Sequence, residues 1–250
     1  MDVSKLNAAI RDIRMPARMS RLPINERGYP IPYFVAVKAN GEHDFRYADA
    51  EKFESCIKQR LCWLCGDRLG QYMVFAIGPM CVVNRNTSEP PCHLECAQYA
   101  CRACPFLSNP AMRRNEKALT EEGYAAGILI PRNPGVTALW ITKRYRLKHD
   151  EKGMILFDIG EPTNVIWYRE GRPATRGEVL ESMYNGLPSL EQHVHTPDEK
   201  EFFVACVARA MHWLPREDSD ARSLRHGERD REGVRSSEQS AEDDKPASSG

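Results

Sequence analysis

The fold of this chain depends on three short segments within residues 62–104: Cys62-Trp63-Leu64-Cys65-Gly66, His93-Leu94-Glu95-Cys96 and Cys101-Arg102-Ala103-Cys104. In each segment two ligand-type side chains are separated by two residues, a spacing that lets both side chains reach one metal ion. Zinc prefers four soft or borderline ligands at the corners of a tetrahedron. The sequence therefore predicts a structural zinc site, with one Zn²⁺ per chain.

The residues around these segments indicate how the site is built. Gly66 permits the positive φ of a knuckle that directs backbone N–H groups at the thiolates of Cys62 and Cys65. Residues 73–77 then alternate like a strand, residues 80–83 can return as a second strand, and a helix is expected to start near Cys92. This order of knuckle, β-hairpin and helix resembles the treble-clef zinc finger over residues 61–104.

The treble-clef resemblance implies that zinc is held by Cys62, Cys65, His93 and Cys96. Spacing alone allows a rival set in which Cys101 and Cys104 replace His93 and Cys96. We prefer the first set because Pro105 places the second cysteine pair near the C-terminal end of the helix, where the helix dipole disfavours thiolates. Cys92, next to His93, is the alternative ligand at the start of the helix.

A wider resemblance rests on the strings CWLCG, IGPM, EPPCHLECA and ACPFL, together with the segment Gly28-Tyr29-Pro30-Ile31-Pro32. They resemble a family of uncharacterised phage and actinobacterial proteins, with a match that spans residues 25–215. This resemblance implies no activity that could be transferred to the chain.

Composition limits the classes of partner. The chain has 250 residues, with 35 basic and 35 acidic side chains, so no global charge attracts it to nucleic acid or to an anionic membrane. No apolar run has the length of a membrane span, and the first residues lack the apolar core of a signal peptide. Nine cysteines then indicate metal binding or free thiols rather than a disulfide framework, and we expect a cytoplasmic protein with no membrane partner.

The expected fold class is α+β, with small mixed or antiparallel sheets, helices, a zinc-stapled treble-clef-like segment and a disordered C-terminal tail. The boundaries follow changes in composition: a solvated N-terminal arm at 1–24, a strand–hairpin–helix unit at 25–60, the zinc-binding segment at 61–108, a C-terminal sheet with two helices at 109–215, and the tail at 216–250. The tail is expected to be disordered because its many charges and few apolar residues cannot offset the entropy of ordering.

Local signals predict several of the elements. Asn40-Gly41 suits a tight hairpin turn, and Asp49 can cap a helix over residues 50–61. Thr175 with Glu178 forms a capping box at the start of another helix. The apolar spacing of residues 197–214 predicts a last helix.

One candidate surface for nucleic acid lies in residues 137–148, which we predict to form one long strand. On such a strand one face carries an aromatic and several basic residues: Trp140, Thr142, Arg144, Arg146 and Lys148. An aromatic with neighbouring cations could contact a base and the phosphates of nucleic acid. The alternative is an ordinary solvated sheet face.

The sequence therefore favours a zinc-containing, non-catalytic binding protein that contacts nucleic acid or a protein, and the motif resemblance points to a phage origin. One alternative is an adaptor that binds only protein. Another is a metal-dependent nuclease of the treble-clef type, but residues 71–92 contain none of the histidines that such a nuclease needs on its hairpin. The oligomeric state does not follow from the sequence.

Overall fold

The structure is a computed structural model that describes residues 3–109, 112 and 133–217. The chain divides into the unit 1–214 and the unit 215–250, of which only residues 215–217 are described. Nearly all of the tail predicted to be disordered therefore lies outside the described residues.

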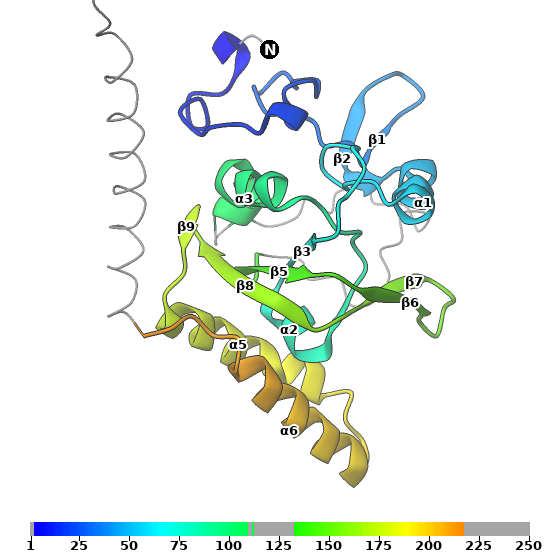
Figure 1. Cartoon of the computed structure of the whole chain (residues 1–250), viewed down its shortest axis with the longest axis vertical. Helices are drawn as coiled ribbons and strands as arrows, with labels where there is room; N and C mark the ends of the chain where they lie inside the picture. The colour runs from blue at the N-terminus through cyan, green and yellow to red at the C-terminus, as the bar shows by residue number, and fades with distance from the viewer. Residues whose placement is uncertain (1–2, 110–111, 113–132, 218–250) are drawn as a thin grey trace, which may run out of the picture. The chain divides into compact units, whose positions relative to one another are not determined.

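The first unit has the predicted α+β fold (Figure 1). Its strands are β1 (Val35–Val37), β2 (His43–Ala48), β3 (Met73–Ile77), β4 (Asn86–Thr87), β5 (Thr137–Thr142), β6 (Tyr145–His149), β7 (Ile155–Ile159), β8 (Pro162–Arg169) and β9 (Arg172–Pro173). The helices are α1 (Ala50–Gln59), α2 (Pro79–Asn84), α3 (Leu94–Ala103), α4 (Pro105–Ser108), α5 (Arg176–Glu191) and α6 (Pro197–Met211), with 3-10 turns η1 (Val3–Lys5) and η2 (Ala17–Met19). All strand pairs are antiparallel, in the orders β1-β2, β3-β5-β8-β9 and β4-β7-β6.

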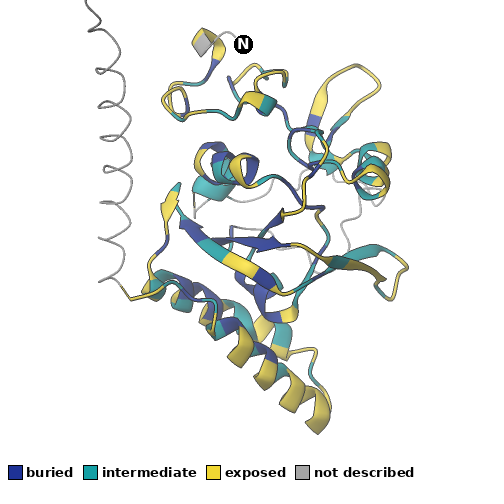
Figure 2. Ribbon diagram, in the orientation of Figure 1, coloured by how far each residue is buried: buried dark blue, intermediate teal, exposed yellow. Residues whose placement is uncertain are grey.

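Strand β5 lies at the centre of the four-stranded sheet, and all of its residues are buried (Figure 2). Leu139 and Ile141 belong to one apolar cluster together with residues of α3. Ala138 and Trp140 belong to a second cluster, with residues of α2, α5 and α6. Because successive side chains of a strand point to opposite faces, β5 supplies both cores of the unit.

The predicted long strand over residues 137–148 is wrong, because the chain breaks between β5 and β6, which belong to different sheets. The hydroxyl oxygen of Thr142 lies 2.9 Å from the carbonyl of Glu161 and 3.3 Å from the amide of Arg144. Such side-chain bonds to the backbone replace the bonds of a continuing ladder. The carbonyl of Arg144 instead accepts a 3.0 Å bond from the amide of Gly160.

The predicted returning strand at residues 80–83 is also wrong, since these residues lie in helix α2. Gly78 is the N-cap and Pro79 takes the first position of the helix, where a missing N–H and a fixed φ are tolerated. Strand β3 therefore pairs with β5, and its only other bridge among the described residues joins Val74 to Cys92. Of the β-hairpin expected from the treble-clef resemblance, only this single bridge is present among the described residues.

The N-terminal arm is solvated only in part, because three of its side chains are buried while the other residues of 4–24 are exposed or half-buried. Leu6, Ile10 and Met19 are buried in the same apolar cluster as Cys62 and Cys96. The amide of Asn7 donates to the carbonyl of Gly28 over 2.9 Å, and a Cβ on Gly28 would lie 2.4 Å from that amide nitrogen. These three side chains therefore belong to the core around the cysteine-rich segment.

Predictions based on local signals are confirmed. Strands β1 and β2 form the expected hairpin around Asn40-Gly41, and the side chain of Asp49 caps α1 by accepting from the amide of Lys52. Thr175 and Glu178 form the complete capping box of α5. Helix α6 follows the predicted last helix and ends at Met211. No helix in the described part of the chain is long and apolar enough to cross a membrane.

Candidate metal centre

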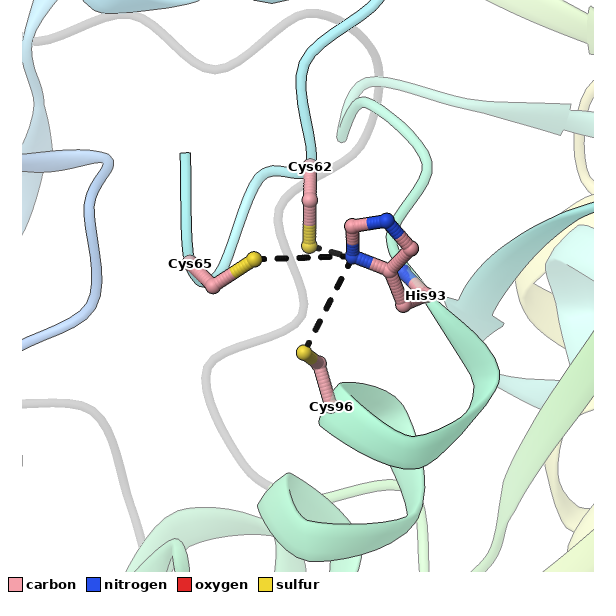
Figure 3. A group of neighbouring side chains, drawn as sticks. All are labelled: Cys62, Cys65, His93 and Cys96. Carbon is pink, nitrogen blue, oxygen red and sulfur yellow. Dashed lines mark hydrogen bonds between the residues drawn. The ribbon is translucent and has the colours of Figure 1, made fainter. Parts of the chain in front are cut away.

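The candidate metal centre lies between the Cys62–Gly66 knuckle and the start of helix α3 (Figure 3). Gly66 has a φ of 76°, and its amide donates to the carbonyl of Cys62 over 2.8 Å. A Cβ on Gly66 would lie 2.7 Å from a ring carbon of Tyr33. The tight turn that brings the first two cysteines together therefore requires glycine at this position.

Four side chains converge there: Cys62, Cys65, His93 and Cys96. Each offers one donor atom, and these atoms all lie within 4.8 Å of one another. The Nδ1 atom of His93 is 3.5 Å from the sulfur of Cys65 and 4.0 Å from the sulfur of Cys96. Zinc–ligand bonds at tetrahedral angles would separate neighbouring donors by about 3.5–3.8 Å. The distances between the donor atoms are thus only slightly longer than those of a tetrahedral zinc site, and the group could hold a metal ion.

The second nitrogen of His93 has a partner of its own. Its Nε2 atom lies 3.1 Å from the carbonyl oxygen of Arg68. A metal bound at Nδ1 leaves the proton on Nε2, which then donates to this carbonyl and orients the ring. The Arg68 carbonyl therefore acts as the outer partner that metal-binding histidines usually have.

Helix α3 contributes to the charge balance of the group. His93 is its N-cap residue and Cys96 lies in its first turn, where the positive end of the helix dipole stabilises a thiolate. The backbone N–H of His93 also points to the sulfur of Cys62 over 3.4 Å. Such backbone donors stabilise the charged form of a thiol.

The pKa values of the group reflect its negative charge. The pKa of His93 is raised to about 10, mainly by its hydrogen bond with the Cys62 thiolate. Hydrogen bonds from Cys65 and then Cys96 lower the pKa of Cys62, while those with Cys62 and Cys65 raise the pKa of Cys96. A divalent cation bound here would displace the protons of the thiols, because zinc binds cysteine as the thiolate.

Two arginines from the N-terminal arm border the centre, and no sequence signal assigned them to it. Arg18 pairs with Glu95 and places a guanidinium nitrogen 3.2 Å from Nε2 of His93. Arg21 pairs with Asp67 and donates to the carbonyl of Cys65 over 3.1 Å. Zinc with three thiolates carries a net charge of about −1, which these cations would partly balance.

The rival ligands are not part of this group. Cys101 lies in the last turn of α3 and Cys104 is its C-cap residue. Burial raises the pKa of Cys101 to about 12, so it is a neutral thiol. Cys92 is buried and its thiol donates to the carbonyl of Val74 over 3.2 Å. The structure therefore brings together the set implied by the treble-clef resemblance.

The residues proposed to contact nucleic acid do not share one exposed face. Trp140 is fully buried, its indole N–H donates to the carbonyl of Gly160 over 2.9 Å, and the guanidinium of Arg85 lies 4.4 Å from its ring centroid. Its predicted role as an exposed stacking residue is therefore wrong. Arg144, Arg146 and Lys148 are exposed, but the last two lie 3.4 and 3.0 Å from the carboxylate of Asp158.

Comparisons of the chain with protein-family models, with curated proteins and with solved structures found no match. The resemblance to phage and actinobacterial proteins therefore stays a prediction from the motifs alone. What the chain itself shows is a group of three cysteines and one histidine that could hold a metal ion.

Proposed function

We propose that Cys62, Cys65, His93 and Cys96 bind one structural zinc ion in a non-catalytic binding protein. The observation that carries this proposal is the convergence of four donor atoms within 4.8 Å. Three thiols and one imidazole are a donor set that zinc favours over magnesium or calcium, which prefer oxygen. Four protein ligands fill a tetrahedron and leave no open position for a substrate.

The position of the site supports a structural role. The two cysteines of the knuckle and Cys96 of α3 belong to one apolar cluster with Leu6 and Ile10 of the N-terminal arm. A metal bound here would join the knuckle and α3 and would hold the surface on which the arm packs. Binding of structural zinc contributes about 10–16 kcal/mol of apparent free energy in small zinc domains, which is comparable to the whole stability of a domain.

Metal content provides the direct test of this proposal. Protein purified without chelators is expected to contain one zinc ion per chain by elemental analysis. Removal of zinc with a strong chelator should lower the melting temperature and expose the thiols to a thiol reagent, and added Zn²⁺ should reverse both effects. Protein that contains no zinc and takes up none would refute the proposal.

We further propose that the partner of this binding protein is another protein, with nucleic acid as the second candidate. The zero net charge gives no long-range attraction to polyanions, and the burial of Trp140 removes the stacking residue from the basic surface. Nucleic acid remains the second candidate because the side chain of Arg146 is 85% exposed on edge strand β6, next to exposed Lys148. A titration with DNA at low and at physiological salt distinguishes the two.

The hairpin on which the nuclease alternative depends is absent from the described residues, because α2 and β4 occupy its place. His93 belongs to the candidate metal centre and is already engaged through both of its ring nitrogens. Nothing in the described site therefore favours the nuclease alternative over the binding protein.

A further inference from the structure

Helix α6 has an exposed face that carries apolar and charged residues in a symmetric order. Phe202 on this face is the most exposed large apolar side chain of the described residues, at 68%. Cys206 and Ala210, which point about 100° and 140° away from Ala205 around the helix, are buried in the core. Phe202 and the exposed Ala205 are flanked by charged residues on this helix, and an apolar surface with a charged rim is the kind that meets a partner.

The exposed face is centred on Ala205. At about 100° per residue, seven positions point within about 60° of the direction of Ala205. We call them the α6 face: Asp198, Glu201, Phe202, Ala205, Ala208 and Arg209 of the helix, and its C-cap residue His212. All seven are exposed. The small side chains of Ala205 and Ala208 would let a second helix approach closely.

We propose that the α6 face binds the α6 face of a second copy of this chain, with the two helices antiparallel. In such a pair a two-fold axis passes beside Ala205. Residues that lie equally far from Ala205 on either side then meet across the axis. Phe202 of each copy packs on Ala208 of the other copy, and Ala205 packs on Ala205 of the second copy.

Charge complementarity supports this occupant. Glu201 and Arg209 lie four residues before and four residues after Ala205. Glu201 of each copy therefore faces Arg209 of the other copy, so the two-fold symmetry forms this ion pair twice. Asp198 meets His212 in the same way. Within residues 3–109, 112 and 133–217, no ion pair engages Glu201 or Arg209, and the guanidinium of Arg209 donates to the sulfur of Cys206 over 3.1 Å. A parallel pair would instead place like charges at the same level.

The contact between two helices of this length is small, at the low end of specific interfaces. We therefore expect a reversible dimer whose population rises with protein concentration. Helix α6 belongs to the apolar cluster on one face of β5, and the candidate metal centre belongs to the cluster on the other face. The proposed dimer therefore depends neither on zinc binding nor on the proposed binding function.

The test is sedimentation velocity of the full chain over a series of concentrations. The wild-type chain is expected to shift from monomer to dimer as its concentration rises. Glu201→Arg alone and Arg209→Glu alone should each be monomeric, because like charges then face each other twice. An equimolar mixture of the two variants should dimerise again, because every facing pair is then of opposite sign.

The mixture also excludes misfolding, since two misfolded variants would not restore a specific dimer. Lys200→Glu is the matched control: it reverses a charge on the same helix, but residue 200 points about 140° away from Ala205. This variant should dimerise like the wild type. A wild-type chain that stays monomeric at every concentration, or single variants that dimerise like the wild type, would overturn the proposal. So would a mixture of monomeric single variants that stays monomeric.

Discussion

The backbone N–H of His93 lies 3.4 Å from the sulfur of Cys62 and points to it. His93 therefore contacts the first cysteine through its backbone, while its ring nitrogen lies 3.5 Å from the sulfur of Cys65. One residue at the start of α3 thus meets both cysteines of the knuckle. The second half of the metal centre therefore comes from the start of α3, and Cys101 and Cys104 near its end are not part of the group.

The first prediction concerns the ligands. Cys96→Ser is expected to lose zinc, because a hydroxyl is a poor zinc ligand and only three good donors remain. Cys101→Ser and Cys104→Ser should each keep one zinc per chain, since neither cysteine belongs to the group of converging donors. The measurement is zinc content after gel filtration. If the Cys101 and Cys104 variants lost zinc and Cys96→Ser kept it, then Cys101 and Cys104 would be the zinc ligands in place of His93 and Cys96.

A second prediction tests the glycine of the knuckle. Gly66→Ala should destabilise the protein by at least about 1–2 kcal/mol, because the substitution places a side chain at positive φ and against the ring of Tyr33. Gly70→Ala is the matched control, since a Cβ there meets no atom within 4 Å. Denaturant unfolding of both variants gives the comparison. Equal stability of the two variants would contradict the tight geometry described for the knuckle.

The third prediction concerns pH. The guanidinium of Arg172 donates to Glu178 in the capping box of α5 and lowers the pKa of this carboxyl to about 2. Because the pKa is lower in the folded state than in the unfolded state, the stabilisation is present above the unfolded pKa of about 4.5 and is lost as the pH falls towards 2. Glu178→Gln should therefore cost about 1–2 kcal/mol at neutral pH.

The difference between wild type and Glu178→Gln should shrink as the pH falls below about 4.5. Urea unfolding at a series of pH values, over the range in which the wild type stays folded, measures it. Glu181→Gln is the control, because the Glu181 side chain is 67% exposed and lies 3.6 Å from Arg169 in a loose ion pair. A difference for Glu178→Gln that stays constant with pH would contradict the assignment.

The local parts of the structure follow from the sequence. Caps and tight turns involve residues close in the chain, such as Asp49 with Lys52, and such signals predicted the elements correctly. The spacing of Cys62, Cys65, His93 and Cys96 likewise indicated the group, because two-residue spacers limit the geometry.

Pairing between distant segments did not follow from the sequence. Alternation in residues 137–148 is compatible with a solvated face, but α2, α5 and α6 contribute to the apolar cluster on the Trp140 side of β5. On a continuous strand, Lys143 would be the one charged residue on the face of Leu139, Ile141, Tyr145 and Leu147. This exception was the signal of the break, since Lys143 lies between β5 and β6. Likewise, the burial of Leu6 and Ile10 depends on a surface formed by the cysteine-rich segment far along the chain.

The last prediction decides between the two classes of partner. If β6 contacts nucleic acid, affinity should fall steeply with salt, because each neutralised phosphate releases counterions. Replacing both Arg146 and Lys148 with alanine should weaken binding to all sequences alike and lower the salt slope by about 0.9 for each phosphate that is no longer neutralised. The measurement is a titration of labelled single- and double-stranded DNA at low and at physiological salt.

Asp158 provides the opposite control for this titration. Its carboxylate lies 3.4 Å from Arg146 and 3.0 Å from Lys148, so it competes with phosphate for both cations. Asp158→Asn should therefore tighten binding and steepen the salt dependence, if the two basic residues contact phosphate. Absence of binding at low salt, where attraction is least screened, would exclude nucleic acid as the partner of β6. The protein-only adaptor would then be the function that fits both the neutral charge of the chain and the burial of Trp140.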